Sequence, residues 1–212
     1  MTTSIDIVDI GSGNVRSIKN SLSSLNLPSK SVSKPEDFSS DILILPGVGS
    51  AGLYMQKIRA SGLDEAIIEH ALSGKRLIGI CLGYQLMSDY SEEDGGVEGL
   101  GLIKGRTEKL RHEGNSLTHN GWQEFLFRKK MLADSAYLTI HNLSRKQKIE
   151  GRVFFNHEYG VICNDENVAT ISIKDDILSP YAAMVVKKNI IGMQFHPEKS
   201  QITGLDLMAM LL

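Results

Sequence analysis

Three short apolar runs rich in isoleucine place the strongest constraint on the fold. They cover residues 5–10, 42–45 and 77–80, and each ends in a turn that contains glycine. Strands that are buried on both faces have this composition, because helices cover both sides of a parallel sheet. Residues 14–25 and 63–72 alternate with these runs and place apolar side chains three and four positions apart, as amphipathic helices do. The pattern predicts an α/β fold with an open, mostly parallel sheet and flanking helices.

The second half of the chain has four strand-like stretches separated by polar turns. They lie at residues 153–159, 168–173, 181–186 and 190–195. Lys187-Lys188-Asn189 joins the last two as a hairpin, so we expect antiparallel additions to the same sheet. Residues 204–212 are apolar and rich in Met, which predicts a terminal helix packed on the core.

Size and charge exclude several classes of protein. The 212 residues, 42% of them hydrophobic, predict a single domain over residues 1–212. A net charge of −2 gives no reason to expect a nucleic acid or membrane partner. The chain opens without a basic region followed by a long apolar run, and two cysteines cannot form a disulfide framework. We therefore expect a cytoplasmic protein with a free thiol.

The stretch Gly79-Ile-Cys81-Leu-Gly83 places a cysteine where a buried strand is predicted to turn abruptly into a helix. Glycine on each side lets the strand and the helix approach closely. The helix N-terminus offers unpaired N–H groups and a positive partial charge, which favour a thiolate over a thiol. Cys81 is therefore a candidate nucleophile, and the alternative is a small core residue.

Among six histidines, only His196 has a suggestive neighbour. In Gln194-Phe-His196-Pro-Glu198 the imidazole and the carboxylate stand two positions apart at the end of a predicted strand. A carboxylate that accepts from one ring nitrogen fixes the tautomer and leaves the other nitrogen free to take a thiol proton. A surface turn is the alternative interpretation.

Two glycine-containing turns could supply backbone donors. Pro46-Gly-Val48-Gly49 follows the second apolar strand, so the N–H groups of Val48 and Leu82 are candidate donors to an oxyanion. A phosphate cradle is the alternative for this turn and for residues 11–16, but neither matches a Walker or dinucleotide fingerprint. No Cys/His cluster has metal-ligand spacing, so we expect no metal and no cofactor.

Four motifs together resemble the class I glutamine amidotransferases, and within them most closely the glutaminase subunits of imidazole glycerol phosphate synthase. They are Val8-Asp-Ile-Gly-Ser-Gly-Asn14-Val-Arg-Ser17, Leu45-Pro-Gly-Val-Gly49, Gly79-Ile-Cys-Leu-Gly-Tyr-Gln85 and Phe195-His-Pro-Glu-Lys-Ser-Gln201. The resemblance implies that Cys81 attacks the side-chain amide of glutamine, that His196 moves protons and that Glu198 orients His196. It further implies oxyanion donors at Val48 and Leu82, and substrate contacts at Gly49 and Gln85.

The resemblance also implies a protein partner, to which the ammonia passes through a channel. In this family the partner is a (β/α)₈ barrel cyclase of histidine biosynthesis, and the Val48 peptide can sit flipped away from the site until the partner's ligand binds. Asn14, Trp122 and Lys199 match positions at or near the docking face. For Trp122, an anchor in the core remains an alternative.

Two departures from the family pattern leave other readings open. Phe155-Asn-His-Glu158-Tyr159 has an acidic side chain where a small hydroxyl is usual near bound glutamine. Thr118-His-Asn-Gly-Trp-Gln123 alters side chains at the expected partner face. One alternative is a glutaminase that feeds a sugar amidotransferase of surface polysaccharide synthesis. A second is a non-catalytic binding module that keeps the fold, and a third, weaker one is a cysteine peptidase.

Overall fold

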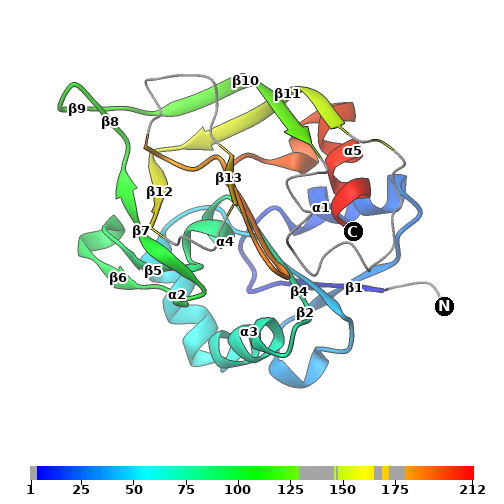
Figure 1. Ribbon diagram of the computed structural model, residues 1–212. Coiled ribbons are helices and arrows are strands. Elements are labelled where there is room, and N and C mark those ends of the chain that lie inside the picture. The colour runs from blue at the N-terminus through cyan, green and yellow to red at the C-terminus, as the bar shows by residue number, and fades with distance from the viewer. Residues whose placement is uncertain (1–3, 129–145, 147, 165–168, 172–179) are drawn as a thin grey trace.

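A seven-stranded sheet crosses the centre of the molecule in a computed structural model that describes residues 4–128, 146, 148–164, 169–171 and 180–212 (Figure 1). The strand order is β13-β14-β15-β4-β3-β1-β2. The bounds are β1 Ile5–Val8, β2 Ser29–Val32, β3 Ile42–Leu45, β4 Arg76–Ile80, β13 Ala169–Ile171, β14 Met184–Lys187 and β15 Ile190–Met193. The ladder from β2 to β15 is parallel, and β14 is antiparallel to both of its neighbours. The expected open, mostly parallel sheet is confirmed.

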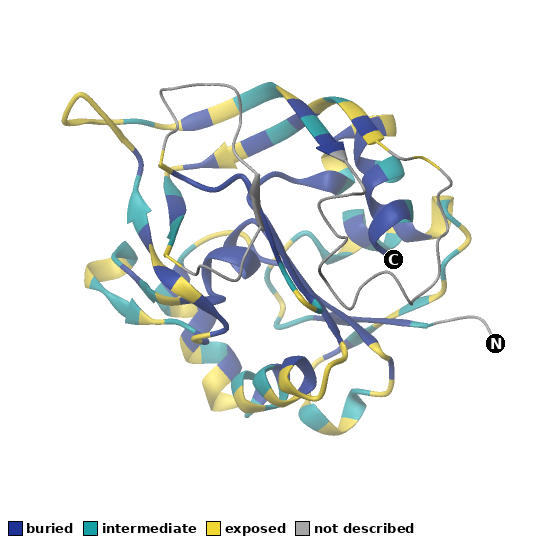
Figure 2. Cartoon of the chain, in the orientation of Figure 1, coloured by how far each residue is buried: buried dark blue, intermediate teal, exposed yellow. Residues whose placement is uncertain are grey.

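Helices cover both faces of this sheet (Figure 1). On one face lie α1 (Val15–Ser24) and α5 (Gln201–Leu211), and on the other lie α2 (Ala51–Ala60), α3 (Leu63–Leu72) and the single-turn α4 (Leu82–Gln85). Successive residues of each strand point to opposite faces of the sheet and contribute alternately to two separate hydrophobic cores. Figure 2 shows the central strands as buried along their length, which explains their uninterrupted apolar sequences.

Further strands lie outside the central sheet. β10 (His119–Arg128) and β11 (Lys148–His157) form an antiparallel ribbon, and β11 packs against α5. A four-stranded sheet has the order β12-β7-β5-β6, and β8 pairs with β9. Their bounds are β5 Ser88–Ser91, β6 Val97–Glu98, β7 Ile103–Lys109, β8 Arg111–His112, β9 Asn115–Ser116 and β12 Tyr159–Cys163. The short 3₁₀ turns are η1 Pro35–Asp37, η2 Glu93–Gly95 and η6 Pro197–Lys199.

One strand prediction is wrong. The stretch 153–159 is not an added strand of the central sheet, because β11 ends at His157 and pairs with β10, whereas Tyr159 begins β12 of the other sheet. The break falls at Glu158, whose backbone carbonyl accepts from the N–H of Leu110 at 2.7 Å. The stretch 168–173 is described only at 169–171, where it forms β13.

The other local predictions hold in type. β3 and α3 begin and end where predicted, and other elements differ at their ends by a few residues. The two early helices, the closing helix and the Lys187–Asn189 turn are confirmed, although the strand expected at 181–186 begins only at Met184. No residue range was predicted for α2 or for β2. Three of the four residues of β2 are polar, and this strand lies at the edge of the sheet. The single domain over residues 1–212 stays a prediction.

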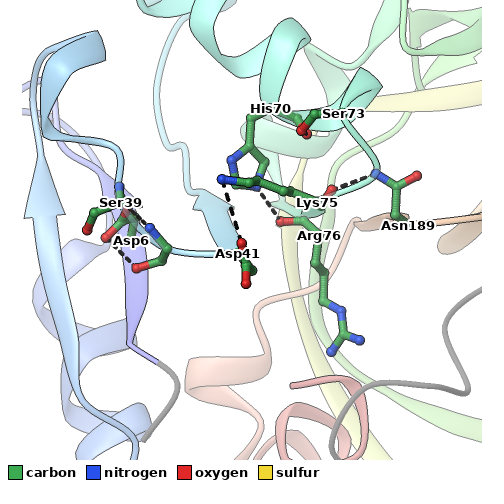
Figure 3. Close-up of polar contacts among 9 residues, drawn as sticks. Asp6, Ser39, Asp41, His70, Ser73, Lys75, Arg76 and Asn189 are labelled. Atoms are coloured by element: carbon green, nitrogen blue, oxygen red, sulfur yellow. Dashed lines mark hydrogen bonds and ion pairs between the residues drawn. The ribbon is translucent and has the colours of Figure 1, made fainter. Parts of the chain in front are cut away.

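Polar side chains cluster at the amino-terminal edge of the central strands (Figure 3). The Asp6 carboxylate accepts from the backbone N–H groups of Ser39 and Ser40 at 2.7 and 3.0 Å. Arg76 donates from Nη1 to the main-chain oxygens of Leu211 and Leu212 at 2.5 and 3.2 Å, which fastens the end of α5 to the start of β4. These contacts satisfy buried backbone groups. The opposite, carboxyl edge is where open α/β sheets bind ligands.

Candidate active site

Cys81 occupies the sharp turn between β4 and α4 at the carboxyl edge of the sheet. Its backbone angles, φ 54° and ψ −112°, lie in a region that residues other than glycine rarely adopt. The Cys81 N–H donates to the carbonyl of Met193 at 2.7 Å, and its own carbonyl accepts from the N–H of Gln85 at 3.1 Å. The turn is therefore held from β15 and from α4, and its strain is typical of a functional site.

Glycines allow the close approach that this turn requires. A Cβ added at Gly83 would lie 1.9 Å from the carbonyl oxygen of Leu45, and one at Gly79 would lie 2.8 Å from Cα of Tyr84. A Cβ at Gly47 would lie 2.7 Å from the backbone N of Gly83. The expected role of the flanking glycines is thus supported, and the turn after β3 packs directly on the nucleophile turn.

His196 follows β15 and is buried together with Glu198. Nδ1 of the imidazole lies 2.8 Å from Oε1 of Glu198, and the two side chains are 1% and 0% exposed. Because the carboxylate can only accept, Nδ1 carries the proton and Nε2 is left for other chemistry. Asn14 donates to the same Glu198 oxygen, since α1 packs against the turn that carries Glu198.

The imidazole of His196 lies beside the sulfur of Cys81 at the same cavity, and the two groups interact electrostatically. Burial lowers the pKa of His196, but the hydrogen bonds and charges of Cys81 and Glu198 outweigh burial and raise the pKa to about 9. The structure therefore brings the three predicted triad residues together across more than a hundred positions of sequence. At neutral pH the imidazole of His196 therefore carries a positive charge.

A cavity of about 380 Å³ opens in front of the sulfur. Its lining residues are Val48, Gly49, Cys81, Leu82, Gln85, Glu93, Thr118, Asn156, His157, Glu158, Tyr159, His196 and Lys199. The two candidate oxyanion residues and the two candidate substrate contacts are all among them. Both N–H groups of the Gln85 amide are engaged, by Tyr159 O at 2.6 Å and by Gln194 Oε1 at 3.1 Å. Only the carbonyl oxygen of Gln85 remains to meet a substrate.

Glu93 also lines the cavity, although nothing in the sequence predicted it there. Burial raises the pKa of its carboxyl to about 7, helped by the charges of Asp94 and Glu158 and opposed by a hydrogen bond from the N–H of Ala51. Glu93 lies in the 3₁₀ turn η2, eight positions after the end of the motif that closes at Gln85. No spacing in the sequence marks it, because the tertiary fold brings this turn to the cavity.

The three residues expected at a partner face occupy different places. Trp122 packs edge-on against Phe154 with ring centroids 5.6 Å apart, and Lys199 Nζ lies 5.8 Å from the centroid of the Phe154 ring. Trp122 also lines a second groove of about 450 Å³ with Arg152. Asn14 instead contacts the carboxylate of Glu198. Docking of a partner at these residues stays a prediction.

The described part of the chain offers neither a candidate metal cluster nor a helix that could cross a membrane. Within the described ranges, no group of three or more His, Cys, Asp or Glu side chains has a geometry that could hold a metal ion. None of the helices described is long and apolar enough to cross a membrane.

Comparison with known structures supports the fold. PurLQS from Thermotoga maritima superposes with a TM-score of 0.71 at 19% identity, covering 100% of this chain and 98% of that one. A crystal structure of a glutamine amidotransferase gives the same TM-score, 0.71, at 17% identity over 97% of this chain and 96% of the other.

Comparison with known sequences identifies the family. The subunit HisH of imidazole glycerol phosphate synthase from Bacillus subtilis (strain 168) is 36% identical over 96% of this chain and 93% of the relative. The Oceanobacillus iheyensis subunit HisH is 39% identical over 96% of both chains, and that of Aquifex aeolicus (strain VF5) is 34% identical over 95% and 92%. The family model for class I glutamine amidotransferase matches residues 6–207. The chain belongs to the class I glutamine amidotransferases, a family of enzymes.

Proposed function

We propose that this chain is the glutaminase subunit of an imidazole glycerol phosphate synthase and supplies ammonia for histidine biosynthesis. The observation that carries the proposal is the buried relay from Glu198 through His196 to the sulfur of Cys81, which faces a cavity of about 380 Å³. The HisH relatives, similar over nearly the whole chain, supply the biological context.

The proposed reaction proceeds through a thioester. The Cys81 thiolate attacks the side-chain amide carbon of glutamine, and the resulting tetrahedral oxyanion accepts hydrogen bonds from the N–H groups of Leu82 and Val48. His196 gives its proton to the leaving nitrogen, so that ammonia departs as the C–N bond breaks. His196 then takes a proton from water, whose oxygen attacks the thioester carbon, and glutamate leaves as the C–S bond breaks.

The lining of the cavity supports a small amino-acid substrate. The carboxylate of Glu93 lines the cavity, and in this proposal it pairs with the α-ammonium group of glutamine. The carbonyl oxygen of Gln85 and the backbone of Gly49 are available to hydrogen bond with the rest of the substrate. The pairing sets a pH requirement, because Glu93 has to be ionised to attract the ammonium group.

Ammonia that enters water is protonated and loses its nucleophilicity, so a partner has to receive it directly. We propose a (β/α)₈ barrel cyclase as this partner, docked over Trp122, Lys199 and the neighbourhood of Asn14. Lys199 lines the cavity and is exposed, which supports a docking face continuous with the site. We place the complex in the cytoplasm, where a reducing environment keeps Cys81 free.

The test is a glutaminase assay on the chain alone, with the cyclase, and with the cyclase plus its nucleotide acceptor. We expect strong stimulation only in the last mixture and none with the Cys81→Ala variant. Absence of glutamate in every mixture would overturn the proposal. The remaining alternative, a non-catalytic binding module, is tested with a glutamine-like electrophile. Failure of this electrophile to label Cys81, with or without the partner, would support the binding module.

Glu158 favours a second candidate, in which the ammonia goes to a sugar amidotransferase. Its acidic side chain lines the cavity, and Asn120 and Gln123 alter the ribbon that carries Trp122. Isolation of the complex with its native partner decides between the two. A barrel cyclase supports the first candidate, and a sugar-modifying synthase supports the second.

A further inference from the structure

Gln194 lies directly behind the nucleophile, although the proposed chemistry gives it no role. It follows β15 and is 2% exposed, and its backbone N–H donates to the carbonyl of Ala183 at 2.9 Å. Its side-chain Nε2 lies 3.9 Å from Sγ of Cys81 and donates to it. Gln194 is not among the residues that line the cavity, so it meets the sulfur from the protein side.

The orientation of the Gln194 amide is fixed by a second amide. Gln85 donates from Nε2 to Oε1 of Gln194 at 3.1 Å, and the same nitrogen donates to the carbonyl of Tyr159 at 2.6 Å. Since a backbone carbonyl can only accept, Gln85 must present its NH₂ group, and Gln194 must present its oxygen to Gln85. The NH₂ group of Gln194 is then the only part of the amide that can face the sulfur.

A neutral donor suits a buried thiolate. Burial penalises a charged sulfur unless hydrogen bonds compensate it. His196 supplies one such contact from the cavity side, but the mechanism requires this imidazolium to turn toward the leaving nitrogen. An amide N–H on the opposite side does not titrate, so it stays in place while His196 moves its proton.

We propose that the side-chain amide of Gln194 is a further functional group of this site, which stabilises the Cys81 thiolate and aims it at the cavity. Hydrogen bonds through the side-chain amides of Gln194 and Gln85 connect the sulfur to the backbone carbonyl of Tyr159, a residue that lines the cavity. The inference rests on the proposed function only in taking Cys81 as the nucleophile.

The test is the pH profile of Cys81 alkylation by iodoacetamide in the intact chain, without glutamine or partner. Peptide mass spectrometry separates Cys81 from Cys163, the second of the two cysteines in the sequence. For Gln194→Met, which keeps the length but removes the donor, we expect the rate at pH 7 to fall about tenfold, the equivalent of one lost hydrogen bond to a charge. At high pH the rate should recover to that of the parent, because all of the sulfur is then ionised.

Two further variants complete the design. Gln194→Glu keeps the shape and the acceptor for Gln85 but places a carboxylate beside the sulfur, so we expect a larger loss at pH 7. It also covers the case in which Gln194→Met does not fold. Gln56→Met makes the same chemical change at an exposed position of α2 and should keep the parental profile.

A parental profile in either folded Gln194 variant would overturn the inference. A uniform loss of rate at every pH would also overturn it, since that result indicates altered access rather than an altered thiolate. Neither outcome depends on glutaminase activity with the cyclase. The proposed function therefore succeeds or fails in its own assay.

Discussion

Nδ1 of the His196 imidazole lies 2.8 Å from Oε1 of the Glu198 carboxylate, and neither side chain is more than 1% exposed. The two residues are separated only by Pro197, which begins a 3₁₀ turn after the strand ends. The turn brings both side chains to one side, and Asn14 fixes the carboxylate from α1. The short His-Pro-Glu motif thereby fixes the orientation of the His196 imidazole and leaves its Nε2 to face the sulfur of Cys81.

Glu198→Gln should lower the pKa of His196 from about 9, because the negative charge that favours the imidazolium is lost. NMR titration of the His196 imidazole measures this shift. The amide can also donate to Nδ1, which selects the wrong tautomer, so stimulated kcat/KM should fall by about 10² to 10⁴. A matched Glu150→Gln change at an exposed position on β11 should leave both quantities unaltered.

Cys81→Gly should be more stable to urea than Cys81→Ala, the reverse of the usual order of these residues. Both variants lose the sulfur, but only alanine keeps a Cβ at φ 54° and ψ −112°. We expect a difference of about 1 to 2 kcal/mol in the free energy of unfolding. Equal or opposite stabilities would show that the turn carries no strain.

Glutamine binding should strengthen as the pH rises through about 7, the pKa to which burial raises the carboxyl of Glu93. Above this pH the ionised carboxylate attracts the substrate ammonium, and below it the neutral acid does not. KM for glutamine, measured in the stimulated complex, reports the transition.

Glu158→Ser should move this transition to lower pH. The substitution removes a negative charge that helps to raise the pKa of Glu93, so Glu93 ionises more readily. Glu98→Ser, at an exposed position on β6, is the control and should leave the midpoint where it is. An unchanged midpoint in Glu158→Ser would mean that the two carboxylates do not interact.

Arg76→Met should destabilise the fold by about 2 to 4 kcal/mol, because it leaves buried main-chain oxygens at the end of α5 without their charged donor. Arg59 makes a comparable bond to the carbonyl of Glu98 at 2.9 Å, but at an exposed position. Arg59→Met should therefore cost less than about 0.5 kcal/mol. Urea unfolding of both variants tests the contrast, and equal losses would contradict the role given to Arg76.

Local patterns were sufficient to predict β3, α3 and the β14–β15 hairpin. A strand buried on both faces is continuously apolar, a helix buried on one face has apolar residues three and four positions apart, and a tight turn has polar residues between two strands. The same holds for the nucleophile turn, where glycines flank Cys81. Local patterns failed for β2, whose polar residues lie at a sheet edge, and for residues 153–159, which divide between two sheets at Glu158.

The proposed chemistry of the site was predictable from Cys81 and from the His196–Glu198 pair, because a thioester reaction requires a nucleophile and an oriented base. Their meeting, and the arrival of Glu93 and Gln194, depend on contacts between segments many positions apart. Such contacts are selected by the packing of whole strands and helices, and packing leaves no periodic signal around the residues it brings together. Residue chemistry is thus encoded locally, whereas the environment that sets the charge on His196 and Glu93 exists only once the chain has folded.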